Sequence, residues 1–141
     1  MAMSKHENNG DCAGCDAIIS KFPNFHLALR AWFKERQKAT PEFHCADAGR
    51  GKVDQERYFS RGLSRAHWGE SAHNYNCGLD TFFLVGGQYR LDEAFYDNLV
   101  QNLPQYIEWL GEKNSPFYER PHFQRRAWRD AVHEGFVKLV E

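Results

Sequence analysis

The spacing of apolar residues in the first half of the chain predicts two helices with a strand between them. From residue 25 to residue 33 apolar side chains recur at intervals of three and four, which predicts an amphipathic helix that continues to about residue 39. Residues 43–48 predict a short strand, and residues 53–60 predict a second helix that ends before Gly62. The polar stretch 63–76 follows neither period, so we expect a loop that carries functional residues.

The second half predicts a hairpin, a helix, a strand and a closing helix. Residues 79–91 contain two β-prone runs joined by Gly86-Gly87, a pair that tolerates the positive φ of a tight hairpin turn. Residues 92–109 predict a helix that is capped by its first residue and bent or broken at its proline. Residues 117–124 predict a last strand, and residues 128–140 predict a closing helix of three to four turns.

This order of elements predicts an α+β fold, in which helices pack against a small, mostly antiparallel sheet. The strands are too few and too unevenly spaced for a parallel βαβ repeat. Residues 1–20 are polar and predict a loose N-terminal arm, which leaves residues 21–141 as one domain. A chain of 141 residues is long enough to bury an apolar core without disulfides.

Charge and hydropathy narrow the classes of partner. A net charge of -1 gives no general electrostatic reason to bind nucleic acid. The N-terminus lacks the apolar core of a secretory signal, and no run approaches the ~18 apolar residues of a membrane span, so we expect no membrane insertion. One basic cluster is expected to be the solvated start of a helix, although contact with an anionic polymer stays open: Arg120, Arg125, Arg126 and Arg129.

The cysteines are expected to be reduced thiols, because the chain reads as a protein made in the cytosol. Cys12 and Cys15 have the spacing of half a zinc knuckle or of a redox pair. His26, His44 and Cys45 could complete a metal site in principle. The full pattern of two plus two ligands is absent, so the sequence favours ordinary thiols.

Two segments supply ligands of the kind that a catalytic zinc ion needs. His73 and Asp80 are seven residues apart with a glycine between them, so a loop imidazole and a strand carboxylate could converge on one ion. Glu119 precedes His122 by three residues, which would let the imidazole bind metal while the carboxylate reaches the attacking water. For His67 and Trp68, just before the first segment, a place near the substrate and simple loop packing are equally open.

Together these segments resemble the superfamily of zinc D-Ala-D-Ala carboxypeptidases and L-alanyl-D-glutamate endopeptidases, especially the compact endolysins of bacteriophages. That family shows S-x-H-x-x-G-x-A-x-D, and dozens of residues later an acid, two residues and His-Phe. The resemblance covers about residues 47–124, and an Arg followed five residues later by Gln is a further shared element. The matching residues here are Ser71, His73 and Asp80, then Glu119, His122 and Phe123, with Arg50 and Gln55 upstream.

The sequence departs from the family pattern at two positions. Asn76 stands where the family usually has glycine, and Gly78 stands where it has alanine. Asparagine is among the residues that best tolerate positive φ, so the turn between the ligands is expected to survive.

The resemblance implies a Hedgehog/DD-peptidase-like fold and a Zn²⁺ ion bound by His73, Asp80 and His122. It also implies that Glu119 is the general base and that Arg50 stabilises the oxyanion or grips a substrate carboxylate. Contact with the substrate is expected of four further residues: Ser71, Gln55, His67 and Trp68.

The function that the resemblance implies is that of a monomeric phage endolysin, which hydrolyses the L-alanyl-D-glutamate bond in the stem peptide of bacterial peptidoglycan. Such an enzyme is expected in the host cytoplasm before lysis and then in the periplasm or cell wall. Two alternatives stay open. One is a D-Ala-D-Ala carboxypeptidase or dipeptidase, and the other is a non-catalytic zinc-binding module of the cell wall or the virion.

Overall fold

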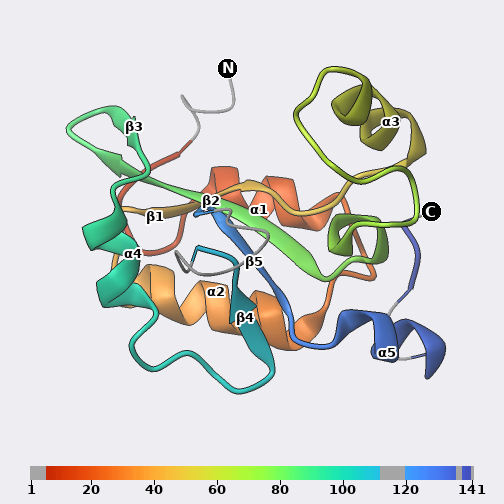
Figure 1. The fold of residues 1–141 in the computed structure, drawn as a ribbon. Coiled ribbons are helices and arrows are strands. Elements are labelled where there is room, and N and C mark those ends of the chain that lie inside the picture. Colours follow the sequence, from red (N-terminus) through yellow and green to blue (C-terminus); the bar gives the residue numbers. More distant parts are fainter. Residues whose placement is uncertain (1–5, 112–119, 136–137, 141) are drawn as a thin grey trace.

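The computed structural model describes residues 6–111, 120–135 and 138–140, and these residues form one five-stranded antiparallel sheet with helices packed against it (Figure 1). The strand order is β1-β2-β5-β4, and β3 also pairs with β2. The strands are β1 (Phe43–Asp47), β2 (Gly78–Val85), β3 (Gln88–Arg90), β4 (Ile107–Trp109) and β5 (His122–Arg125). The α+β prediction is therefore confirmed.

The helices surround this sheet, with α4 near the β2–β3 turn at one end and α3 and α5 at the other (Figure 1). None of the helices among the described residues is both long and apolar enough to cross a membrane. The helices are α1 (Ala13–Ser20), α2 (Leu27–Ala39), α3 (Lys52–Ser60), the 3-10 helix η2 (Ala72–Tyr75), α4 (Glu93–Leu99) and α5 (Trp128–His133).

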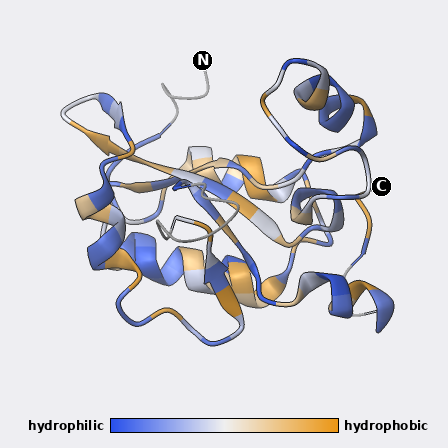
Figure 2. Ribbon diagram, viewed as in Figure 1, coloured by the Kyte–Doolittle hydropathy of each residue, from blue (hydrophilic) through white to orange (hydrophobic). Residues whose placement is uncertain are grey.

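The main core lies between α2 and the sheet. Trp32 of α2 packs against Phe123 with ring centroids 4.9 Å apart, and Phe33 packs against Phe43 at 5.3 Å. Because side chains alternate along a strand, Leu79 and Phe83 join this core, whereas Asp80 and Phe82 face the other side of the sheet. The helices carry both hydrophobic and hydrophilic residues, as Figure 2 shows.

Most elements of the first half and the hairpin agree with the sequence. The helix predicted over 25–39 is α2, the strand predicted over 43–48 is β1, and the helix predicted over 53–60 is α3. In the hairpin, Gly86 and Gly87 have φ angles of 59° and 76°, which confirms the need for glycine at that turn.

The prediction of one helix over 92–109 is wrong. The helix α4 ends at Leu99, and after an irregular stretch the chain forms β4, which pairs with β5. Pro104 cannot donate a helical hydrogen bond, and Ile107 becomes fully buried once it pairs in the sheet. A strand partner that is distant in sequence therefore outweighs the local helical pattern.

Both C-terminal predictions also need correction. The strand predicted over 117–124 begins at His122 among the described residues, and positions 117–119 lie outside them. The closing helix predicted over 128–140 stops at His133, because Gly135 adopts a φ of 79° that an α-helix does not allow. Val140 instead donates its backbone N–H to the carbonyl of Asn74 at 2.6 Å.

The structure also differs from the loose arm predicted over residues 1–20. Residues 13–20 form α1, and Cys12, Cys15 and Ile19 are completely buried in the main core. Their spacing of three and four places them on one helix face, but the polar residues around them hide this pattern in the sequence.

Candidate metal centre

Strand pairing brings two of the predicted metal ligands together. In the antiparallel register of β2 and β5, Asp80 lies directly opposite His122, although the two are 42 residues apart in sequence. Residues directly opposite each other in a sheet place their side chains on the same face. The carboxylate and the imidazole therefore meet on the face of the sheet that α2 does not cover.

The third predicted ligand, His73, is held by the short helix η2. The Ser71 hydroxyl accepts a hydrogen bond from the backbone N–H of His73 at 3.2 Å, and Ser71 and Asn74 form a capping box at the start of this helix. The carbonyl of His73 accepts a hydrogen bond from the backbone N–H of Arg50 at 3.0 Å. These bonds fix the direction in which the imidazole leaves the backbone.

The turn from η2 into β2 depends on both positions at which the sequence departs from the family pattern. Asn76 has φ 60° and ψ 31°, so it adopts the left-handed conformation that was expected to survive there. A Cβ atom on Gly78 would lie 2.9 Å from the backbone nitrogen of His73 and 3.2 Å from the Cβ of Ala72. Only glycine lets β2 approach η2 this closely.

The three donor atoms form a nearly equilateral triangle. His73 Nε2 lies 3.2 Å from His122 Nδ1, and Asp80 Oδ1 lies 3.2 Å from the first nitrogen and 3.1 Å from the second. Donors bound at 2.0–2.1 Å to a tetrahedral zinc ion are separated by about 3.3 Å. The triangle therefore has the size of one face of a zinc coordination tetrahedron, and the fourth corner is left for water or substrate.

The three side chains of the site differ in how exposed they are to solvent. The imidazoles of His73 and His122 are 3% and 5% exposed, whereas the Asp80 side chain is 21% exposed. Burial by itself would raise the pKa of the Asp80 carboxyl, but the two neighbouring imidazoles outweigh it and hold that pKa well below its usual range. Asp80 is thus an ionised carboxylate at the accessible edge of the site.

Arg50 contacts the other oxygen of this carboxylate, Oδ2, which does not face the imidazoles. One terminal nitrogen of its guanidinium lies 3.5 Å from Asp80 Oδ2 and 3.2 Å from Asp47 Oδ2, and the other donates to Gln55 Oε1 at 3.1 Å. The Tyr58 ring lies 4.3 Å below the guanidinium carbon. With both terminal nitrogens engaged by protein groups, the contacts favour a positioning role for Arg50 over direct contact with substrate.

A second chain of hydrogen bonds orients His122. Its Nε2 lies 2.8 Å from Gln124 Oε1, and Gln124 Nε2 donates to Glu108 Oε2 at 2.6 Å. An amide oxygen accepts from N–H, so Nε2 carries a proton and Nδ1 is the nitrogen left to bind a metal ion. No motif singles out Gln124 or Glu108, because only the β4–β5 register brings them to the site.

The remaining predicted residues lie at different distances from the site. Gln55 is fully buried, and its amide bonds internally to Arg50, Ser64, Ala66 and Asn74, so it has no surface for a substrate. His67 is exposed and pairs with Glu56 of α3 at 3.0 Å, and the backbone of half-buried Trp68 bonds to the same carboxylate. Substrate contact by His67, Trp68 and Ser71 stays a prediction. Glu119 lies outside the described residues.

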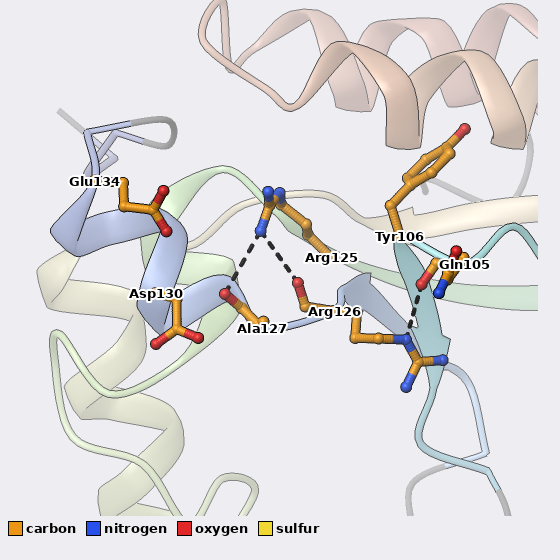
Figure 3. A pocket seen from close by; sticks show the side chains of 7 residues that line it. All are labelled: Gln105, Tyr106, Arg125, Arg126, Ala127, Asp130 and Glu134. Carbon is orange, nitrogen blue, oxygen red and sulfur yellow. Dashed lines mark hydrogen bonds between the residues drawn. The ribbon is translucent and has the colours of Figure 1, made fainter.

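A surface pocket of about 420 Å³ lies elsewhere on the molecule (Figure 3). It is bounded by residues that precede β4, by the end of β5 and by α5, and it contains none of the three ligands. Two of its arginines are tied to backbone carbonyls: Arg126 Nε donates to Gln105 at 2.8 Å, and Arg125 donates to Arg126 at 3.1 Å. The predicted chemistry therefore does not take place in this pocket.

Comparisons with known proteins identify a similar fold. No protein family model matches the sequence, and no curated protein matches it either. Among solved structures, the chain resembles the Serratia marcescens L-Ala D-Glu endopeptidase ChiX, with a TM-score of 0.65 and 18% sequence identity. The similarity covers 84% of this chain and 90% of that chain, so the two proteins share the fold over nearly their whole lengths.

Proposed function

We propose that this chain is a zinc-dependent peptidoglycan endopeptidase that hydrolyses the L-alanyl-D-glutamate bond of the stem peptide. The observation that carries the proposal is the triangle of His73, Asp80 and His122, whose donor atoms lie 3.1–3.2 Å apart. The shared fold with a protein described as an L-Ala D-Glu endopeptidase supports the choice of bond.

The residues present fit a zinc ion, because two imidazoles and one carboxylate are a common catalytic donor set with one position left open. When bound, zinc would polarise the scissile carbonyl and lower the pKa of its water. His122 would keep the tautomer that Gln124 enforces, and Arg50 would hold the second oxygen of Asp80 away from the open position. The side chains of His122 and Asp80 would thus keep their positions during hydrolysis of the substrate.

Proton transfer is assigned to Glu119. Its position three residues before His122 supports this role, since a base must reach the proton of the attacking water within hydrogen-bond distance. Glu119 would take that proton and return it to the leaving amine. The assignment of the general base rests on the sequence.

The test is mass spectrometry of purified peptidoglycan digested by the native chain and by Glu119→Ala. We expect the native chain to release fragments with a new D-glutamate N-terminus, and Glu119→Ala to bind the same zinc but lose at least about 100-fold in rate. Glu35→Ala is the matched control, because Glu35 lies on α2 with its side chain 76% exposed. It should behave like the native chain.

Other products would select an alternative function. Loss of terminal D-alanine with intact L-alanyl-D-glutamate bonds would identify a carboxypeptidase or dipeptidase. Bound zinc with no cleavage of any bond would identify a non-catalytic module of the cell wall or virion. Full activity of Glu119→Ala would remove Glu119 from the mechanism.

The biological setting that we propose is phage lysis, with the enzyme held in the host cytoplasm until a separate pore lets it reach the wall. Expression inside bacteria tests this setting. Cells should stay intact until the membrane is permeabilised, and lysis should then follow only with the active chain.

A further inference from the structure

A second group of metal-binding side chains lies on another part of the sheet. His6 comes from the N-terminal segment, Cys12 and Cys15 come from the start of α1, and His44 comes from β1. All four side chains are buried, both cysteines and His44 completely so. Their donor atoms all lie within 4.8 Å of one another.

We propose that His6, Cys12, Cys15 and His44 bind a structural zinc ion. The distances support this assignment. His6 Nδ1 lies 3.3 Å from Cys12 Sγ and 3.4 Å from Cys15 Sγ, and His44 Nδ1 lies 3.4 Å from Cys15 Sγ. In a tetrahedral zinc site with bonds of about 2.3 Å to sulfur and 2.0–2.1 Å to nitrogen, these atoms are separated by about 3.5 Å.

The surrounding groups are arranged as in a metal-thiolate site. Cys15 Sγ accepts a hydrogen bond from the backbone N–H of Cys45 at 3.2 Å and one from Gln37 Nε2 at 3.4 Å. Such donors stabilise the negative charge of a sulfur ligand. The same Gln37 side chain, fully buried on α2, accepts a hydrogen bond from the backbone N–H of Cys12 at 3.2 Å.

His44 is held in the tautomer that a metal requires. Its Nε2 lies 2.7 Å from Asn8 Oδ1, and an amide oxygen accepts from N–H, so Nδ1 keeps its lone pair toward the sulfur atoms. The Phe82 ring, 1% exposed, packs against the rings of His6 at 5.1 Å and His44 at 5.4 Å. Both imidazoles are thus fixed before a metal binds.

This group differs chemically from the three-ligand centre. Two thiolates and two imidazoles complete a tetrahedron, so no position is left for water or substrate, as in structural zinc sites. The ion would join the N-terminal segment and the start of α1 to β1, where His44 lies 29 residues beyond Cys15. His26, considered from the sequence as a ligand, instead caps α2 by accepting from the N–H of Leu29 at 3.2 Å.

The ion would also stabilise the pairing of β1 with β2, the strand that carries Asp80. His44 on β1 lies opposite Phe82 on β2, and Phe82 follows Asp80 by two residues. Removal of the ion is therefore expected to lower the stability of the whole domain. The four ligands lie outside the triangle of the first centre, so this proposal does not depend on the proposed hydrolysis.

The test begins with metal content of the full chain purified under reducing conditions. We expect two zinc ions per chain in the native protein and one in the double variant Cys12→Ser with Cys15→Ser. Cys77→Ser is the matched control, because Cys77 is also a buried free cysteine but belongs to neither metal group. It should keep two zinc ions. The double variant should also lose about 10 °C or more in Tm.

Cobalt substitution keeps the proposal testable where the double variant does not fold. Cobalt bound by thiolates gives a sulfur-to-metal charge-transfer band, and the centre of His73, Asp80 and His122 contains no sulfur. The native chain and Cys77→Ser should both show this band at saturating cobalt. Its absence from the native chain, or a Cys12–Cys15 disulfide in the purified protein, would overturn the assignment whatever the result for peptidoglycan.

Discussion

The left-handed backbone at Asn76 makes a prediction whose sign can be worked out from the structure. Asn76 joins the helix that carries His73 to the strand that carries Asp80, and its φ of 60° is unfavourable for residues with a Cβ. Alanine there would meet a penalty of about 1–2 kcal/mol that glycine does not meet. Glycine would cost about 0.5–1 kcal/mol in chain entropy. We therefore expect Asn76→Gly to be more stable than Asn76→Ala by about 0.5–1 kcal/mol.

Both variants lose the same side-chain contact, so it cancels in the comparison. Asn76 Nδ2 donates to the carbonyl of Lys138 at 2.8 Å, and loss of this bond should cost each variant about 0.5–1.5 kcal/mol relative to the native chain. Urea unfolding followed by tryptophan fluorescence measures these differences, with all variants at the same saturating zinc concentration so that metal loading is equal.

The control for this experiment is Asn24, an exposed asparagine with an ordinary negative φ. There the order should be reversed, with Asn24→Ala at least as stable as Asn24→Gly. If Asn76→Ala equalled or exceeded Asn76→Gly in stability, the left-handed turn would be refuted as the reason for an asparagine at this position.

Three further predictions use the same kind of argument. Ala127 has a φ of 55°, so Ala127→Gly should stabilise the protein by about 0.5–1 kcal/mol, whereas Ala31→Gly within α2 should destabilise it by about 1 kcal/mol in the same urea assay. Gly78→Ala should cost about 1–3 kcal/mol and weaken zinc binding, measured by competition with a chromophoric chelator, because the added Cβ would overlap the backbone of η2. Burial, and then Arg125, lower the pKa of His26, whose neutral ring caps α2, so its contribution is complete above pH ~6.5 and is lost as the pH falls through the lowered value. His26→Asn, which keeps a cap but cannot titrate, should have a smaller loss of Tm between pH 7 and pH 5 than the native chain, and an equal loss would contradict this role.

The sequence predicted the elements whose signal is local. The apolar periodicity of α2 and the glycine pair of the hairpin each identify one structure without reference to distant residues. The β4–β5 pairing, by contrast, joins segments that are separated by about a dozen residues. The helix predicted over residues 92–109 wrongly included β4, because the local pattern does not show this pairing. The site shows the same contrast between local signals and contacts that depend on strand pairing. The spacing of His73 and Asp80 suggested convergence, but the contacts of Gln124 and Glu108 exist only through the sheet register.

The second metal group was recognised only in part, for a related physical reason: Cys12, Cys15 and His44 were candidates in the sequence, but His6 was not. A zinc site is recognisable in sequence when its ligands come in two close pairs, but here only Cys12 and Cys15 form such a pair. His6 precedes them in a segment whose polar composition suggested a loose arm, and His44 is contributed by the strand on which α1 packs. The sequence could not choose among His26, His44 and Cys45 as partners of the two thiols, and the fold brings His6 and His44 to them.

The two groups differ in what they leave accessible, and this difference separates the roles proposed for them. Three donors with a partly exposed carboxylate suit a metal that must meet a substrate, whereas four buried donors suit a metal that only links segments. Substitution of one ligand residue at the first centre should therefore lower the rate of hydrolysis more than it lowers the stability of the fold. The reason is that Arg50 and Gln124 hold the remaining ligands independently of the metal. At the second centre the order should be reversed, since the ion would add a link between the N-terminal segment and β1 beyond the Asn8–His44 hydrogen bond and the packing of His6 on His44.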